Sequence, residues 1–174
     1  SVSYNQWFAA VLAGRSNVGL RAEDIVRIVH FAKQGPHKFS DISALAIGPL
    51  GSELLHAAVF DQDIGKIGLV RPFLSYADIA TTRFYEADYI PFTVPGALNE
   101  YDLPDLMAKL CPRKLLILEP LSGDGLLAGE TKASNGMRFP SKVYTEKGVA
   151  GNFNLVSGLD EQTTLEDLVK VLLK

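Results

Sequence analysis

Four side chains of the sequence are candidates for the chemistry of ester hydrolysis. Ser52 and Ser75 are hydroxyl nucleophiles, His56 is a base, and Asp124 is an acid that would orient the base. Such chemistry needs a serine hydroxyl within hydrogen-bond reach of a histidine, and the histidine needs a carboxylate to hold it. Catalysis by a set drawn from these four residues is therefore one hypothesis for this chain.

Each of these residues also has a structural interpretation, which we favour. Ser52 opens an expected helix, where its hydroxyl would accept from a free backbone N–H. Asp124 lies between two glycines, as turn aspartates do. His56 lies inside an apolar helix, so we expect a hydrogen-bonded core histidine rather than a base.

The remaining composition argues against cofactors and polyanionic partners. The three histidines are scattered and have no metal-ligand spacing, and no phosphate-binding glycine loop occurs. We therefore expect no cofactor and no metal. A net charge of −3 gives no attraction to nucleic acid or an anionic membrane. No apolar run of about 18 residues is present to cross a bilayer.

Hydrophobic periodicity and breaker residues predict alternating helices and strands. The expected helices are Tyr4–Leu12, Arg21–Gln34, Ser52–Phe60, Leu103–Leu110, Ala128–Met137 and Thr163–Leu173, and the expected strands are Ile42–Ile47, Lys66–Val70, Lys114–Leu118 and Lys142–Thr145. This order predicts a three-layer α/β/α fold with a mainly parallel sheet. Ile42–Ile47 is mostly apolar, as expected of a strand buried on both faces.

A long segment, Arg71–Tyr101, interrupts the alternation and is rich in aromatic residues. These side chains either form a small core that holds the segment down or line a sugar-binding cleft. We favour the small core. The aromatic residues are Phe73, Tyr76, Phe84, Tyr85, Tyr89, Phe92 and Tyr101.

The turn Gly48-Pro49-Leu50-Gly51 connects an expected buried strand to an apolar helix. This unit resembles the nucleophile elbow of the α/β-hydrolases, G-x-S-x-G, whose serine stands at the apex of a strained turn. If Gly51 matches the last glycine of the motif, Pro49 takes the position of the serine. Proline has no nucleophilic group, and its fixed φ conflicts with such an apex.

Other segments resemble the acetyl xylan esterase-like branch of the same superfamily. They are Gly14–Ser16, Arg21–Ile25, Leu55–Asp61, Pro72–Tyr76, Pro95–Leu98, Tyr101–Leu106 and Cys111–Arg113. The resemblance implies a truncated α/β-hydrolase-like fold, a carbohydrate or small ester ligand, and a periplasmic or secreted location. It also implies that the triad acid would be Asp124.

Two departures from the family pattern shape the functional hypotheses. No strand is expected before residue 40, so we expect residues 1–174 to be the C-terminal part of a larger domain or protein. Because the missing strands leave a sheet edge, we also expect a partner domain or a second copy to cover it. The catalytic histidine is expected in the loop Glu146–Gly158, which contains none.

These features lead to two hypotheses. The first is a catalytically inactive α/β-hydrolase-like domain with a structural or carbohydrate-binding role. The second is an ester hydrolase of the acetyl xylan type with a non-standard site, built from Ser52 or Ser75 with His56 and Asp124. A nucleotide-binding flavodoxin-like module is disfavoured by the absence of a phosphate-binding loop.

Overall fold

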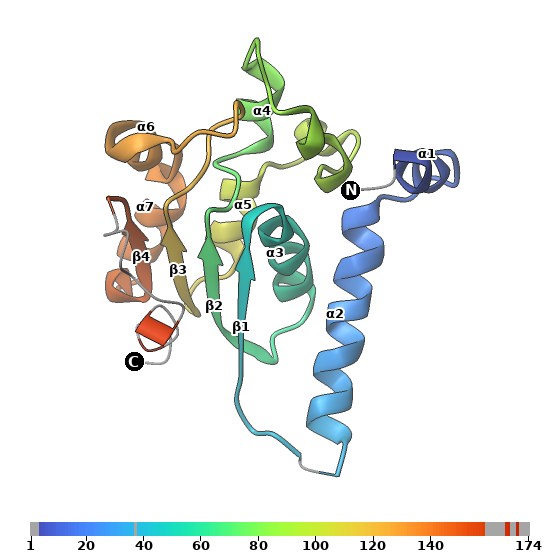
Figure 1. Ribbon diagram of the computed structural model, residues 1–174. Helices are drawn as coiled ribbons and strands as arrows, with labels where there is room; N and C mark the ends of the chain where they lie inside the picture. Colours follow the sequence, from blue (N-terminus) through green and yellow to red (C-terminus); the bar gives the residue numbers. More distant parts are fainter. Residues whose placement is uncertain (1–3, 37, 159–165, 168–169, 171–174) are drawn as a thin grey trace.

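The computed structural model describes residues 4–36, 38–158, 166–167 and 170. Its centre is a four-stranded sheet in which every neighbouring pair is parallel (Figure 1). The spatial order of the strands equals their order in the chain, β1-β2-β3-β4. Their bounds are β1 Ile42–Ile47, β2 Ile64–Val70, β3 Lys114–Leu118 and β4 Phe153–Val156.

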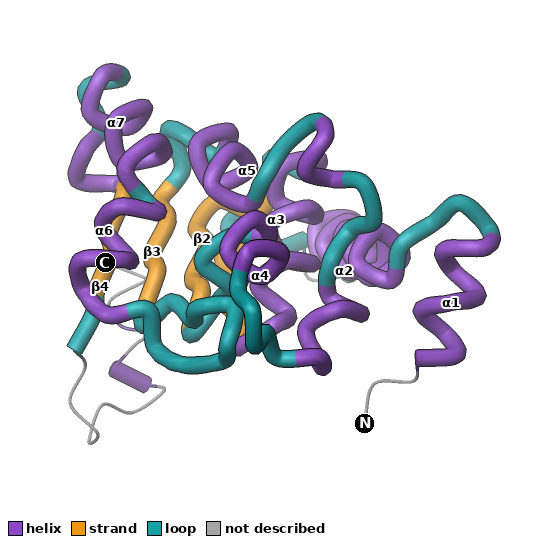
Figure 2. The backbone as a smooth tube through the Cα atoms, turned by 90° about the horizontal axis from the view of Figure 1, so that it is seen from above, coloured by secondary structure: helices purple, strands orange, loops and turns teal. Residues whose placement is uncertain are grey.

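Helices connect and cover the strands. Figure 2 shows α3, α5 and α7 side by side along one face of the sheet, with the helical residues 166–167 on the other. The expected three-layer α/β fold with a parallel sheet is therefore confirmed. The helices are α1 Tyr4–Leu12, α2 Asn17–Gln34, α3 Gly51–Phe60, α4 Tyr76–Thr81, α5 Leu103–Lys109, α6 Gly129–Gly136 and α7 Arg138–Glu146, and the 3₁₀ turns are η1 Gly48–Leu50, η2 Ala87–Phe92, η3 Ala97–Asn99 and η4 Ala150–Asn152.

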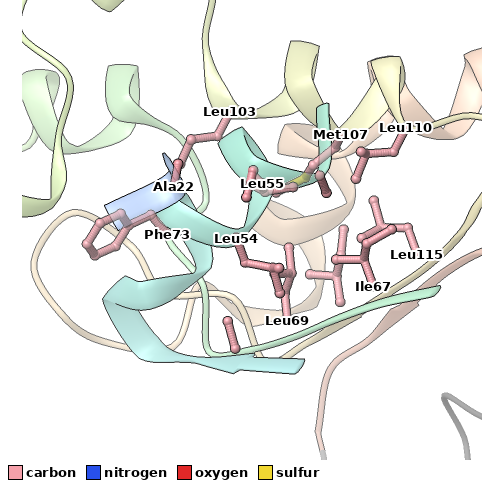
Figure 3. Packing of buried hydrophobic residues seen from close by; sticks show 14 of the residues in the cluster. Ala22, Leu54, Leu55, Ile67, Leu69, Phe73, Leu103, Met107, Leu110 and Leu115 are labelled. Atoms are coloured by element: carbon pink, nitrogen blue, oxygen red, sulfur yellow. The ribbon is translucent and has the colours of Figure 1, made fainter. Parts of the chain in front are cut away.

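The core forms around α3, whose residues 51–58 are all buried. Leu54 and Leu55 of this helix pack with Ile67 and Leu69 of β2 and with the apolar side of α5 (Figure 3). Because α3 is apolar on nearly all sides, it is stable only when enclosed in this way. The core thus fixes the position of the turn that precedes α3.

One predicted strand is wrong. Residues 142–145 belong to α7, and the fourth strand is Phe153–Val156. Pro140 and Tyr144, four residues apart, are the buried residues of α7, which is the spacing of a helix face. A short apolar stretch does not by itself distinguish a strand from a helix.

Two further expectations need correction. Helix α2 begins at Asn17, because Ser16 caps it by accepting a hydrogen bond from the Gly19 N–H. Strand β1 is not buried on both faces; it is an edge strand, with Ser43 and Ile47 exposed.

The helix expected at residues 163–173 lies mostly outside the described residues. No described helix is long and apolar enough to span a membrane.

Candidate active site

The turn between β1 and α3 has its apex at Gly48. This residue follows the strand directly and has a left-handed backbone, with φ of 64°. Pro49 comes one position later, in the first turn of η1. The expectation that Pro49 occupies the apex is therefore corrected, because proline's fixed φ excludes it from a left-handed position.

Glycine reaches this conformation at little steric cost, and it has no side chain that attacks a carbonyl. A Cβ atom built on Gly48 would meet nothing within 4 Å. The turn therefore presents an open apex without a nucleophile. Neither Gly48 nor Pro49 has a nucleophilic side chain.

The same geometry recurs at the next two strands. Arg71 and Glu119 directly follow β2 and β3 and have φ of 51° and 52°. Since Val70 pairs in register with both Ile47 and Leu118, the three turns lie along one edge of the sheet. This carboxyl edge is where ligands bind in open α/β sheets.

Glu119 is a buried acidic residue at this edge that sequence reasoning did not single out. Its carboxylate accepts a hydrogen bond from the Gly158 N–H, so it connects the ends of β3 and β4. The sequence signal was an acidic residue placed directly after a buried strand. Glu119 borders a cavity of about 340 Å³ that is lined by Pro120, Leu127, Gly129, Glu130, Ser157 and Gly158.

Ser52 is buried in the first turn of α3. Its hydroxyl lies 2.9 Å from the Phe92 carbonyl oxygen, 3.0 Å from the Pro49 carbonyl oxygen and 3.1 Å from Glu53 Oε2. One hydroxyl proton is donated to one acceptor at a time, so these acceptors share it. The hydroxyl thereby connects the elbow to the segment that carries η2.

His56 lies one helical turn after Ser52 and is also buried. Its Nδ1 lies 2.6 Å from the Ser52 carbonyl oxygen, and its Nε2 lies 2.8 Å from the Tyr101 hydroxyl. Because a carbonyl only accepts, Nδ1 carries the proton and Nε2 accepts from the tyrosine. Burial lowers the pKa of His56, which favours the neutral ring.

The structure does not join these two residues into a nucleophile–base pair. The imidazole of His56 bonds the backbone of Ser52, and the hydroxyl of Ser52 bonds other groups. His30, the other described histidine, lies 3.1 Å from Asp61. Within residues 4–36 and 38–158, neither histidine is hydrogen-bonded to a serine hydroxyl or a cysteine thiol.

A second acidic residue missed from the sequence, Glu53, lies beside Ser52. It is buried, and its Oε1 forms an ion pair with Arg21 Nη1 at 3.1 Å. Burial raises the pKa of Glu53, and the hydrogen bonds from Arg21 and Ser52 oppose that rise. No sequence pattern around Glu53 indicates that it is buried and paired, because its partner Arg21 lies on another helix, α2.

Ser75 and Asp124 have the contacts of turn and cap residues. Ser75 Oγ accepts from the Asp78 N–H at 2.9 Å and so caps α4. Asp124 is exposed, and its Oδ1 accepts from the Leu126 N–H at 3.1 Å. Neither side chain is bonded to His56, so the four candidate residues do not form a catalytic set in this conformation.

The aromatic residues of segment 71–101 mostly pack inward. Phe73, Tyr76, Tyr89 and Phe92 are buried in the main core, and the rings of Phe73 and Tyr89 lie 4.4 Å apart. These side chains hold the segment down, as expected, but they do so as part of the main core and not as a separate small core. Over the described part of the chain, no group of three or more metal-ligating side chains comes together.

Comparison with known proteins yields one informative likeness. A scan of protein-family models and a search of curated proteins match nothing. Among solved structures, the chain is similar to a Bacteroides fragilis NCTC 9343 protein described as a putative acetyl xylan esterase, with a TM-score of 0.69 and 15% identity. The match covers 92% of this chain and 41% of that one, so this chain spans about two fifths of its neighbour. An identity this low shows the fold, which is esterase-like.

Proposed function

We propose that this esterase-like domain does not hydrolyse esters and has a structural or carbohydrate-binding role within a larger protein. The observation that carries the proposal is Gly48. It occupies the left-handed apex of the strand-to-helix turn, where an esterase of this fold would present its nucleophile.

The polar groups below the turn support a structural role. Ser52, Glu53 and His56 are buried, and each is bonded to protein groups on other elements as well as locally. Buried polar side chains that are satisfied in this way rigidify a fold. The carbohydrate part of the proposal comes from the neighbouring structure, whose description names acetyl xylan.

One observation favours the alternative, an ester hydrolase with a non-standard site. Ser52 Oγ lies 3.1 Å from a buried carboxylate, and a neutral histidine is one turn away. A rearrangement that breaks the bond between His56 and Tyr101 would be required before His56 accepted a proton from Ser52. The resting geometry therefore favours the inactive domain.

Esterase assays on the purified chain distinguish the two functions. We expect p-nitrophenyl acetate and acetylated xylan to be consumed at the rate measured in buffer alone. We also expect Ser52→Ala to lower the free energy of unfolding by about 1–2 kcal/mol, because it removes a buried hydrogen bond. Turnover that disappears in Ser52→Ala and persists in Ser75→Ala would establish the hydrolase instead.

A separate titration tests the carbohydrate-binding role. Calorimetry with acetylated xylo-oligosaccharides is expected to detect heat of binding if the domain recognises sugar. An absence of heat at millimolar oligosaccharide would leave the structural role as the function.

A further inference from the structure

Glu53 is a buried carboxylate at the contact between two helices. It lies in the first turn of α3 with its side chain 1% exposed, and α2 packs along this helix (Figure 1). Its Oε1 pairs with Nη1 of Arg21, a side chain of α2 that is 38% exposed. The ion pair therefore joins a group that is shielded from water to one that water reaches, and it connects the N-terminal parts of the two helices.

The two carboxylate oxygens of Glu53 have different partners. Oε1 faces Arg21, whereas Oε2 lies 3.1 Å from the Ser52 hydroxyl oxygen. That hydroxyl also lies 2.9 and 3.0 Å from the carbonyl oxygens of Phe92 and Pro49. Because a hydroxyl both donates and accepts, Ser52 can donate to one of these carbonyls while it accepts from a protonated Glu53. A neutral Glu53 thus has a hydrogen-bond acceptor already in place.

We infer that Glu53 is a pH-dependent clasp between α2 and α3. In its ionised form the carboxylate holds the Arg21 guanidinium. When Oε2 takes up a proton, it donates a hydrogen bond to Ser52, and the negative charge that held Arg21 is lost. Arg21 then turns to the water that already reaches it, and the first turns of α2 lose this attachment to α3. The inference does not depend on whether the domain binds sugar or hydrolyses esters.

The other titratable groups that face Glu53 are neutral. Tyr76 approaches from α4, and burial raises the pKa of its hydroxyl, so it carries no charge at pH 7. His56 lies on the next turn of α3, where burial lowers the pKa of the ring and favours its neutral form. Among the described residues, Arg21 is therefore the group whose charge stabilises the Glu53 carboxylate.

Burial sets the direction of the pH effect. It raises the pKa of Glu53 above the ordinary value of 4.5, although the hydrogen bonds from Arg21 and Ser52 oppose the rise. A carboxyl group whose pKa is higher in the folded chain stabilises the fold fully below the unfolded-state pKa, and this contribution is lost as the pH rises through the folded-state pKa. The clasp should therefore open within the folded protein as the pH falls toward 4.5, and protonation of Glu53 does not drive unfolding.

An NMR titration of the wild-type chain tests the clasp directly. We expect the side-chain carboxyl carbon of Glu53 to titrate with a midpoint above pH 4.5, and the guanidinium resonances of Arg21 to shift with the same midpoint. Arg21→Gln should raise the Glu53 midpoint by at least about 0.5 pH unit, because it removes the stabilising charge. Arg27→Gln is the matched control; it removes a cation of α2 that pairs with Glu23 and Asp24, and it should leave the midpoint within about 0.2 pH unit.

Hydrogen exchange measures the attachment of α2. After correction for the intrinsic exchange rates, amides of residues 21–25 should be at least about twofold better protected at pH 7 than at pH 4.5. Glu53→Gln has the shape of the side chain without its charge, so it should show the lower protection at both pH values. Glu23→Gln is the control, because it alters only exposed ion pairs of α2, and it should keep the wild-type difference.

Several results would overturn the inference. They are a Glu53 midpoint below pH 4.5, Arg21 resonances that do not follow the titration of Glu53, and an unchanged Glu53 midpoint in Arg21→Gln. Equal losses of protection in Glu53→Gln and Glu23→Gln would also overturn it, because any loss of negative charge from these helices would then have the same effect.

Discussion

His56 stays neutral in the fold because burial away from water disfavours its charged form, and this outweighs the hydrogen bond to the Ser52 carbonyl, which favours a protonated ring. Its pKa is lowered from the ordinary value of 6.5. As the pH falls through 6.5, His56 therefore becomes protonated in the unfolded chain while it stays neutral in the folded chain. The neutral His56 therefore contributes its full stabilisation above pH 6.5. This stabilisation is lost as the pH falls from 6.5 to the lower pKa of the folded state.

Replacement of this histidine should change how stability depends on pH. We expect His56→Gln to be less stable than the wild type at pH 7.5, by about 1–3 kcal/mol, because two buried hydrogen bonds are disturbed. The difference should shrink between pH 7 and pH 5, since glutamine does not titrate. Urea unfolding across this range measures it, and a difference that stays constant with pH would contradict the assignment of a neutral buried ring.

At the scale of elements, the short helix α4 depends on a residue of α5. Asp102 caps α5, and its carboxylate also accepts from the backbone N–H groups of Tyr76 and Ala77 at 2.7 and 3.1 Å. A six-residue helix has little stability of its own. One carboxylate thus holds two helix N-termini, where negative charge is favourable.

We therefore expect Asp102→Ala to lower the free energy of unfolding by about 2–3 kcal/mol. The matched control is Asp124→Ala, which removes a single bond of an exposed turn and should cost less than about 1 kcal/mol. Thermal unfolding followed by circular dichroism compares the two. Equal losses in both variants would show that Asp102 acts only as a local cap.

For the whole molecule, the backbone amides should be better protected from hydrogen exchange toward the centre of the sheet than at its β1 edge. β3 is bonded on both sides and buried along most of its length, whereas β1 pairs with a strand on one side only among the residues that the structure describes. We expect amides of residues 115–117 to exchange slowest and those of β1 to exchange earlier. Hydrogen exchange with mass spectrometry measures this order, and equal protection of β1 and β3 would mean that the β1 edge is covered in solution.

Strong local signals in the sequence were enough to predict several elements. Strand Lys114–Leu118 has the predicted bounds because an apolar run is enclosed by Pro112 and Pro120. Helix α3 was predicted within one residue, and its deep burial followed from apolar side chains on nearly all its sides. Alternating apolar elements of this kind are enough to predict a parallel α/β sheet.

Three features could not be predicted before the chain is folded: the residue at the apex of the turn, the strand at the edge of the sheet, and the partners of the buried polar side chains. Gly48 and Pro49 are both turn residues in the sequence, and only the backbone path gives the left-handed position to Gly48. The partners of Glu53 and His56 are 32 and 45 residues away in the chain. Periodicity and spacing report on neighbours along the chain, whereas pairing, burial and charge compensation depend on residues that meet only after folding.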